Sequence, residues 1–82
     1  MASYREFKTQ RQAIADAAAS ARDWAEDNKE PMTADVLLWS GDTLHITSTQ
    51  DGKLSRRITA GWERHGVLFC SRKTASLAMK GP

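Results

Sequence analysis

Residues 43–60 read T-L-H-I-T-S-T-Q-D-G-K-L-S-R-R-I-T-A, and this stretch decides the fold. Threonine, isoleucine and leucine are frequent on both sides of Asp51-Gly52, and an Asp-Gly pair between alternating runs is typical of a β-hairpin. A two-residue loop would set apolar side chains beside polar ones on both faces. A three-residue loop over 50–52, with Gly52 in the left-handed conformation, moves the pairing by one residue and changes the face of every side chain. The sequence therefore predicts the three-residue loop.

This register gives the hairpin one apolar face and one polar face. The predicted pairs are Leu44 with Ile58, Ile46 with Arg56, and Ser48 with Leu54. The polar face then holds Thr43, His45, Thr47, Thr49, Ser55, Arg57 and Thr59. Arg56 is the one charged side chain on the apolar face, and we expect its guanidinium to reach solvent at an edge or to meet a carboxylate of another element.

Length and composition predict one small domain over residues 1–82, with little room for an enclosed active site. No run approaches the roughly 18 apolar residues of a membrane span, and the N-terminus lacks the apolar core of a signal peptide. A lone cysteine, Cys70, fits a reducing compartment. We therefore expect a soluble, cytoplasmic protein.

The net charge of +2 conceals an uneven distribution of charge. Residues 1–42 carry five Lys/Arg against eight Asp/Glu, whereas residues 43–82 carry seven against two. Such asymmetry can indicate a nucleic-acid or acidic-protein partner, although the two halves could also neutralise each other within the fold. The acidic group formed by Asp23, Glu26, Asp27 and Glu30 could likewise bind the basic strands, bind another molecule, or remain solvated.

A long N-terminal helix is expected over about 4–28. Ser3 and Glu6 have the S-x-x-E spacing of a capping box at its start, and Pro31 disfavours helix just beyond its end. Apolar residues recur within it at spacings of three and four, and most are alanine. This smooth stripe can approach the apolar face of the hairpin closely, or it could serve as a coiled-coil seam.

Strands are expected at about 35–40, 43–49, 53–61 and 66–71. If Trp39 pairs with Thr43 across the intervening turn, Leu37 and Trp39 emerge on the polar face beside His45 and Arg57. The run Val67–Cys70 is too uniformly apolar for its faces to be assigned, and residues 71–80 could form a short helix. The predicted fold is α+β: a long N-terminal helix packed on an antiparallel meander of three or four strands, with a short C-terminal helix as a further element.

The sequence offers little support for catalysis or for a cofactor. His45 and His65 stand apart from any ligand cluster, so neither predicts a metal site. Cys70 lies in an apolar run, where a thiol is usually inert packing. There is no G-x-S-x-G nucleophile turn and no glycine-rich phosphate loop. We therefore expect no catalytic residues, no metal and no cofactor.

Binding without catalysis is the remaining prediction. The protein would be a small intracellular adaptor or inhibitor, a build that also occurs in phages and mobile elements, and it would dock on an acidic region of a larger protein. The expected contact residues are Trp39, His45, Thr47, Lys53, Arg57 and Arg64. The alternative is a nucleic-acid-binding protein that uses the same basic and aromatic surface, with Arg72 and Lys73 as further phosphate contacts.

Overall fold

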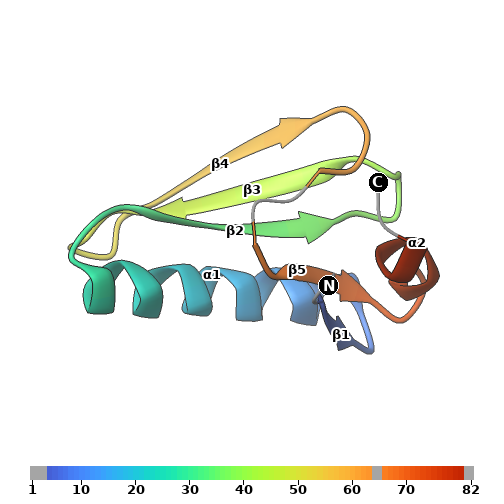
Figure 1. Ribbon diagram of the computed structural model, residues 1–82, viewed down its shortest axis with the longest axis horizontal. Coiled ribbons are helices and arrows are strands. Elements are labelled where there is room, and N and C mark those ends of the chain that lie inside the picture. The colour runs from blue at the N-terminus through green and yellow to red at the C-terminus, as the bar shows by residue number, and fades with distance from the viewer. Residues whose placement is uncertain (1–3, 64–65, 81–82) are drawn as a thin grey trace.

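The computed structural model describes residues 4–63 and 66–80, which form a five-stranded sheet and two helices (Figure 1). Along the chain the elements are β1 (Tyr4–Phe7), α1 (Gln10–Asn28), β2 (Met32–Leu37), β3 (Thr43–Ser48), β4 (Leu54–Thr59), β5 (Leu68–Ser71) and α2 (Ala75–Lys80). The strand order across the sheet is β1-β5-β2-β3-β4. β1, β5 and β2 are parallel, whereas β2, β3 and β4 form an antiparallel meander. The α+β class is confirmed, but the sheet is mixed and has five strands, so the prediction of an antiparallel meander of three or four strands is wrong.

The β3–β4 hairpin has the predicted register, and all three predicted pairs are present. The Thr49 N–H donates to the Lys53 carbonyl at 2.9 Å, so residues 50–52 form the three-residue loop. Gly52 has a φ of +90°, a conformation that glycine adopts without the steric cost that a Cβ would bring. Local turn chemistry therefore sets which side chains of this hairpin face α1.

The β2–β3 turn is shifted by two residues from the predicted pairing. Leu37, not Trp39, pairs with Thr43, and β2 ends at Leu37. A shift of two residues preserves the face of each side chain, and Val36 points into the core that α1 covers. Trp39 lies beyond the end of β2, in the turn itself.

The predicted start of the long helix is wrong, because β1 occupies the first part of the expected helix and α1 begins at Gln10. Thr9 is the N-cap, and its Oγ1 accepts a hydrogen bond from the Gln12 N–H at 3.2 Å. Thr9 and Gln12 have the same capping-box spacing that predicted a cap at Ser3. The chain thus holds two such signals, and the pairing of β1 with β5 excludes a helix at the first. The helix ends at Asn28, as predicted.

β5 lies inside the sheet, where it pairs in parallel with β1 on one side and with β2 on the other. Two antiparallel pairings separate β4 from β2, so β4 and β5 run in the same direction. A tight hairpin cannot join parallel strands; the described residues after β4 instead lie against the face of the sheet opposite α1, where Thr43 Oγ1 donates to the Gly61 carbonyl at 2.9 Å. The uniform apolar run Val67–Cys70 suits a strand that is covered on both faces. This coverage explains why its faces could not be assigned and why it does not continue the meander.

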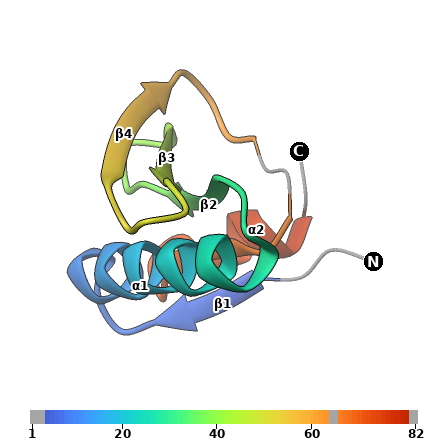
Figure 2. The same ribbon diagram turned by 90° about the vertical axis from the view of Figure 1, so that its left-hand side faces the viewer.

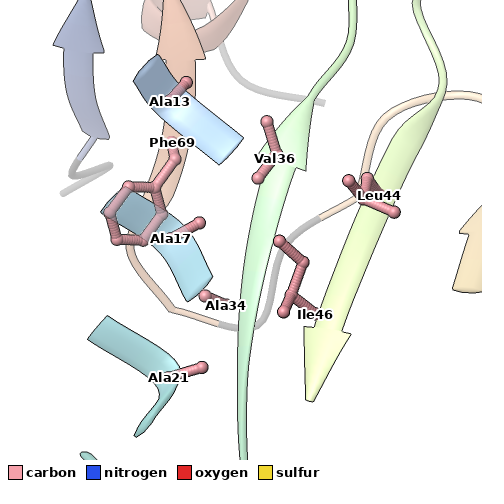
Figure 3. Close-up of a cluster of buried hydrophobic side chains, with 8 residues drawn as sticks. All are labelled: Ala13, Ala17, Ala21, Ala34, Val36, Leu44, Ile46 and Phe69. Carbon is pink, nitrogen blue, oxygen red and sulfur yellow. The ribbon is translucent and has the colours of Figure 1, made fainter. Parts of the chain in front are cut away.

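α1 packs on one face of the sheet through its alanine stripe, which Figure 3 shows in close-up. Alanine side chains spaced four residues apart along α1 lie against β2, β3 and β5, and their small size lets the helix approach the sheet closely. All eight residues of this cluster are buried: Ala13, Ala17, Ala21, Ala34, Val36, Leu44, Ile46 and Phe69.

α2 lies on the opposite face of the sheet, at its β1–β5 side (Figures 1 and 2). Leu68 and Cys70 of β5 pack there against Ala75 and Ala78 of α2, and Trp62 of the 60–67 connection lies partly buried beside them. α2 does not reach β4, because β2 and β3 separate β4 from β5.

Candidate functional site

β4 is the last strand of the sheet, and only β3 pairs with it among the described residues (Figure 2). Ser55, Arg56 and Arg57 are exposed, and so is Ile58, at 61% of its surface. Between Lys53 and the end of the strand the chain carries three cations and no carboxylate. β4 therefore presents a basic, unpaired edge with one large apolar side chain. We call it the β4 edge.

The cations of the β4 edge are not neutralised by the rest of the described chain. No carboxylate within residues 4–63 or 66–80 lies within ion-pair distance of Lys53, Arg56 or Arg57. The basic side chains that do form ion pairs lie elsewhere, as in the 3.6 Å contact between Arg72 Nε and Glu6 Oε2. Arg56 reaches solvent at the edge of the sheet, as predicted.

Hydroxyl groups line the outer face of the sheet beside Arg57. Thr47 of β3 is half-buried, and its Oγ1 lies 2.8 Å from the Oγ1 of Thr33 on β2. Thr47 also pairs across the strands with Ser55, which is exposed. Since hydroxyls both donate and accept hydrogen bonds, this face can complement the charge of Arg57 with neutral polar contacts.

His45 is buried, which corrects its place in the predicted contact set. Its side chain points away from α1, as the register predicted, but only 2% of it is exposed. The imidazole Nδ1 lies 2.7 Å from Asp35 Oδ1, and Nε2 lies 2.8 Å from Thr59 Oγ1. Glu63, which follows β4, places Oε1 4.0 Å from Nε2. A partner cannot reach the imidazole, because the side chain is buried among these neighbours.

Asp35, His45 and Thr59 form a hydrogen-bonded series of carboxylate, imidazole and hydroxyl, an order that nucleophilic enzymes also use. In the tautomer whose Nδ1–H donates a hydrogen bond to the Asp35 carboxylate, Nε2 of the neutral imidazole accepts a hydrogen bond from the Thr59 hydroxyl. However, two surface hollows of the described chain include none of these three residues. One hollow lies between β1 and α1, and the other lies between α1 and the β3–β4 turn. The geometry favours a structural role in which the series joins β2, β3 and β4.

Trp39 does not lie beside Arg57, which corrects a second prediction. Its indole Nε1 donates to Ser71 Oγ at 2.7 Å, and its backbone N–H donates to Gln10 Oε1 at 2.8 Å. Lys73 Nζ lies 4.7 Å from the indole centroid, within cation–π range. The side chain nevertheless remains 53% exposed. Trp39 therefore belongs with the start of α1 and the end of β5.

Lys8, Trp39, Arg72 and Lys73 follow the ends of the three parallel strands β1, β2 and β5. Because parallel strands end at the same edge of a sheet, these residues gather near the start of α1. We call this surface the carboxyl edge. Lys8, Arg72 and Lys73 are exposed there, and two strands separate β5 from β4. The predicted basic contact residues that the structure describes thus lie on two surfaces, with Lys53 and Arg57 on one and Arg72 and Lys73 on the other.

Cys70 is fully buried, and its Sγ lies 3.6 Å from the Arg5 carbonyl oxygen. Burial, with a smaller contribution from the charge of Glu6, raises the pKa of the thiol to about 11. Cysteine reacts as the thiolate, so this side chain is unreactive near neutral pH.

Three further features of the sequence predictions concern Arg64, a metal site and a membrane span. Arg64, one of the predicted contact residues, lies outside the described residues. Within residues 4–63 and 66–80, no three His, Cys, Asp or Glu side chains are placed to hold a metal ion together. Neither described helix is long and apolar enough to cross a membrane.

Sequence reasoning missed the roles of two residues. Ile58 was expected in the core, but it is exposed because the packed face of α1 does not extend over it. Asp35 carried a usable signal, since a carboxylate between Ala34 and Val36 in a buried strand requires a polar partner. His45, on the polar face of the next strand, was the available candidate.

The chain matches no protein-family model, no curated protein and no solved structure.

Proposed function

We propose that this protein is a non-catalytic binding protein that docks on an acidic region of a larger protein through the β4 edge and the outer face beside it. It would act as an adaptor or an inhibitor. Lys53 and Arg57 supply the charge, and Thr47 supplies neutral hydrogen bonds. His45 and Trp39 are not part of this revised contact set.

One observation carries the proposal: within residues 4–63 and 66–80, the exposed cations of β4 have no carboxylate within ion-pair distance, and β4 is an edge strand. Neighbouring cations repel one another, and together they attract acidic surfaces over roughly the 8 Å Debye length of physiological salt. An adjacent exposed apolar side chain, Ile58, adds area that a partner can bury. The two hollows described above, between β1 and α1 and between α1 and the β3–β4 turn, do not include Arg56, Arg57 or Ile58.

The test is capture of a partner by two charge variants. Arg57→Glu should abolish the capture of a partner from lysate of the source cell, because it reverses the charge at the centre of the proposed surface. Glu26→Lys reverses a charge on the exposed acidic end of α1, far from the strand in sequence, and should leave capture unchanged. Circular dichroism would confirm that both variants fold. The opposite pattern of loss would contradict the proposal and move the binding site to α1.

A second candidate function is nucleic-acid binding at the carboxyl edge. The observation that favours it is the exposed Trp39 ring beside Lys73, with Lys8 and Arg72 nearby. Indole rings can stack on bases, while Lys and Arg contact phosphates. The Trp39 indole already contacts Ser71 and Lys73 within the protein, however. This is why we place it second.

A gel-shift assay with generic nucleic acid separates the two candidates. Phosphate binding weakens log-linearly with salt whatever the base sequence. We expect no tight binding of generic duplex or single-stranded nucleic acid at physiological salt in a gel-shift assay. Tight binding that is lost in Lys73→Glu but kept in Arg57→Glu would favour nucleic acid at the carboxyl edge over protein docking at β4.

A further inference from the structure

The backbone of β4 offers hydrogen-bonding groups to a further strand. Antiparallel pairs alternate between residues that exchange hydrogen bonds and residues that do not. The Thr49 N–H donates to the Lys53 carbonyl at 2.9 Å, so the hydrogen-bonded pairs recur at every second residue and include His45 with Arg57. The N–H and C=O groups of the intervening residues, among them Arg56 and Ile58, therefore point away from β3. Nothing in the described chain pairs with them.

The side chains around these groups alternate in chemistry as well as in direction. Arg56 and Ile58 lie on the α1 side of the sheet, and Arg57 lies on the outer side. All three are exposed. An added strand would therefore meet one cation on each face and one apolar side chain on the α1 face. Directly opposed cross-strand side chains lie about 4.5–5.5 Å apart at Cβ, close enough for ion pairs.

A second copy of β4 is a poor occupant of this edge. An antiparallel pairing of two β4 strands centred on Arg56 would place the two Arg56 side chains directly opposite each other, with each Arg57 opposite Ser55 of the other copy. Like charges that are directly opposed destabilise a pair of strands, and cations on edge strands commonly block pairing between copies. Charge complementarity instead selects a segment that carries carboxylates.

We propose that the β4 edge binds an extended acidic segment of the partner protein as a sixth strand, antiparallel to β4. The segment carries an apolar residue opposite Ile58, followed by an acidic residue opposite Arg57 and a second acidic residue opposite Arg56. Backbone hydrogen bonds supply affinity in this mode, and the alternating side chains supply specificity. The strand addition rests on the proposed function, because the same cations serve both.

Synthetic peptides test the inference without a cell lysate. The probe is the peptide Thr-Val-Thr-Ile-Glu-Glu-Thr-Val, and the control replaces both glutamates with lysine. We expect the acidic peptide to shift the backbone amide signals of Arg56 and Ile58 in ¹⁵N-resolved NMR spectra and to slow the hydrogen exchange of these two amides at least tenfold. The lysine peptide should do neither. Acidic-peptide shifts confined to the carboxyl edge would overturn the inference.

Backbone methylation of the peptide provides a matched pair of probes. In the proposed register, the N–H groups of the isoleucine and the second glutamate point at β4, and the N–H of the first glutamate points away. Methylation of the first two groups should weaken binding at least tenfold, whereas methylation of the third should have little effect. Equal effects at all three positions would contradict the strand addition.

A pair of variants at position 58 separates this inference from the proposed function. Ile58→Pro removes an N–H that β3 does not use, and proline is tolerated on edge strands with that geometry. Ile58→Ala keeps the N–H and removes the side chain. We expect the proline variant to lose peptide binding at least tenfold more than the alanine variant. If folded Ile58→Pro binds like wild type while Arg57→Glu does not, strand addition fails and docking through the outer face stands; if both bind like wild type, both proposals fail.

Discussion

At the scale of single residues, the buried polar series of Asp35, His45 and Thr59 has the greatest consequence. Asp35 and His45 are 1% and 2% exposed, and they join β2 to β3 at 2.7 Å. Thr59 extends the series to β4. Every buried side-chain nitrogen and oxygen of the described chain has a hydrogen-bond partner. Because an unpaired polar group would be costly here, the series penalises any other register of these three strands.

We expect Asp35→Ala to lower the free energy of unfolding by about 3 kcal/mol, because breaking a buried pair leaves the remaining polar group without its carboxylate. The exposed Asp23→Ala should change stability by less than about 0.5 kcal/mol. Urea denaturation of both variants checks this. A double-mutant cycle with His45→Ala should show a coupling energy of at least about 1 kcal/mol, and additive effects would contradict the assigned contact.

Cys70 predicts a stability loss at alkaline pH. Its pKa is raised from 9.0 to about 11 in the folded protein, chiefly by burial. Above pH 9 the unfolded chain releases the thiol proton while the folded chain retains it, so unfolding becomes more favourable as pH rises from 9 towards 11. The loss should approach about 2 kcal/mol at pH 11. Urea denaturation of wild type and Cys70→Ala at pH 8 and pH 10.5 checks it; an identical pH dependence of the two proteins would show that other groups cause the loss.

At the scale of elements, residues close in sequence determine where hairpins turn and helices end. They do not determine which strands pair with each other. Gly52 and the alternating pattern around it set the β3–β4 register within a few residues of the turn. The start of α1 was ambiguous, because capping-box spacings begin at both Ser3 and Thr9. Only the contact of β1 with β5, more than 60 residues away in sequence, excludes the first.

The cap at Thr9 gives a prediction for α1. Thr9→Ala should lower the free energy of unfolding by about 1 kcal/mol, because it removes the acceptor of the Gln12 N–H. Thr9→Ser keeps the hydroxyl and should cost little. Thermal or urea denaturation followed by circular dichroism measures both changes. Equal destabilisation by Ala and Ser would indicate that the threonine methyl group, rather than the cap, stabilises this end of the helix.

At the scale of the whole molecule, the sheet has one protected and one open side. α1 and α2 cover opposite faces around β5, whereas β4 is bare at its edge and exposes Arg56, Arg57 and Ile58 (Figure 2). Along the chain, residues 1–42 carry an acidic excess and residues 43–82, which include β4, carry a basic excess. An open edge of this kind invites pairing with other chains unless its side chains prevent it.

We expect the double variant Arg56→Thr, Arg57→Thr to self-associate more strongly than the wild-type protein, because it removes the like charges that oppose pairing of β4 strands. Sedimentation velocity over a range of concentrations should show a steeper rise of the average sedimentation coefficient. The control is Lys8→Thr, Arg11→Thr, which removes two exposed cations near the start of α1. If both double variants associate equally, the lost net charge and not the β4 edge is responsible.

The sequence by itself determined the α+β class, the parity and loop of the β3–β4 hairpin, the end of α1 and its alanine face. These features depend on interactions between residues close in sequence, so their signals are local. Only the tertiary structure decided the parallel pairing of β5 between β1 and β2, the burial of His45, and the separation of Trp39 from Arg57. The physical reason is that an apolar run such as Val67–Cys70 predicts that the segment is buried but does not predict which strands pair with it. The route of the chain between β4 and β5 then decides which polar side chains remain in water.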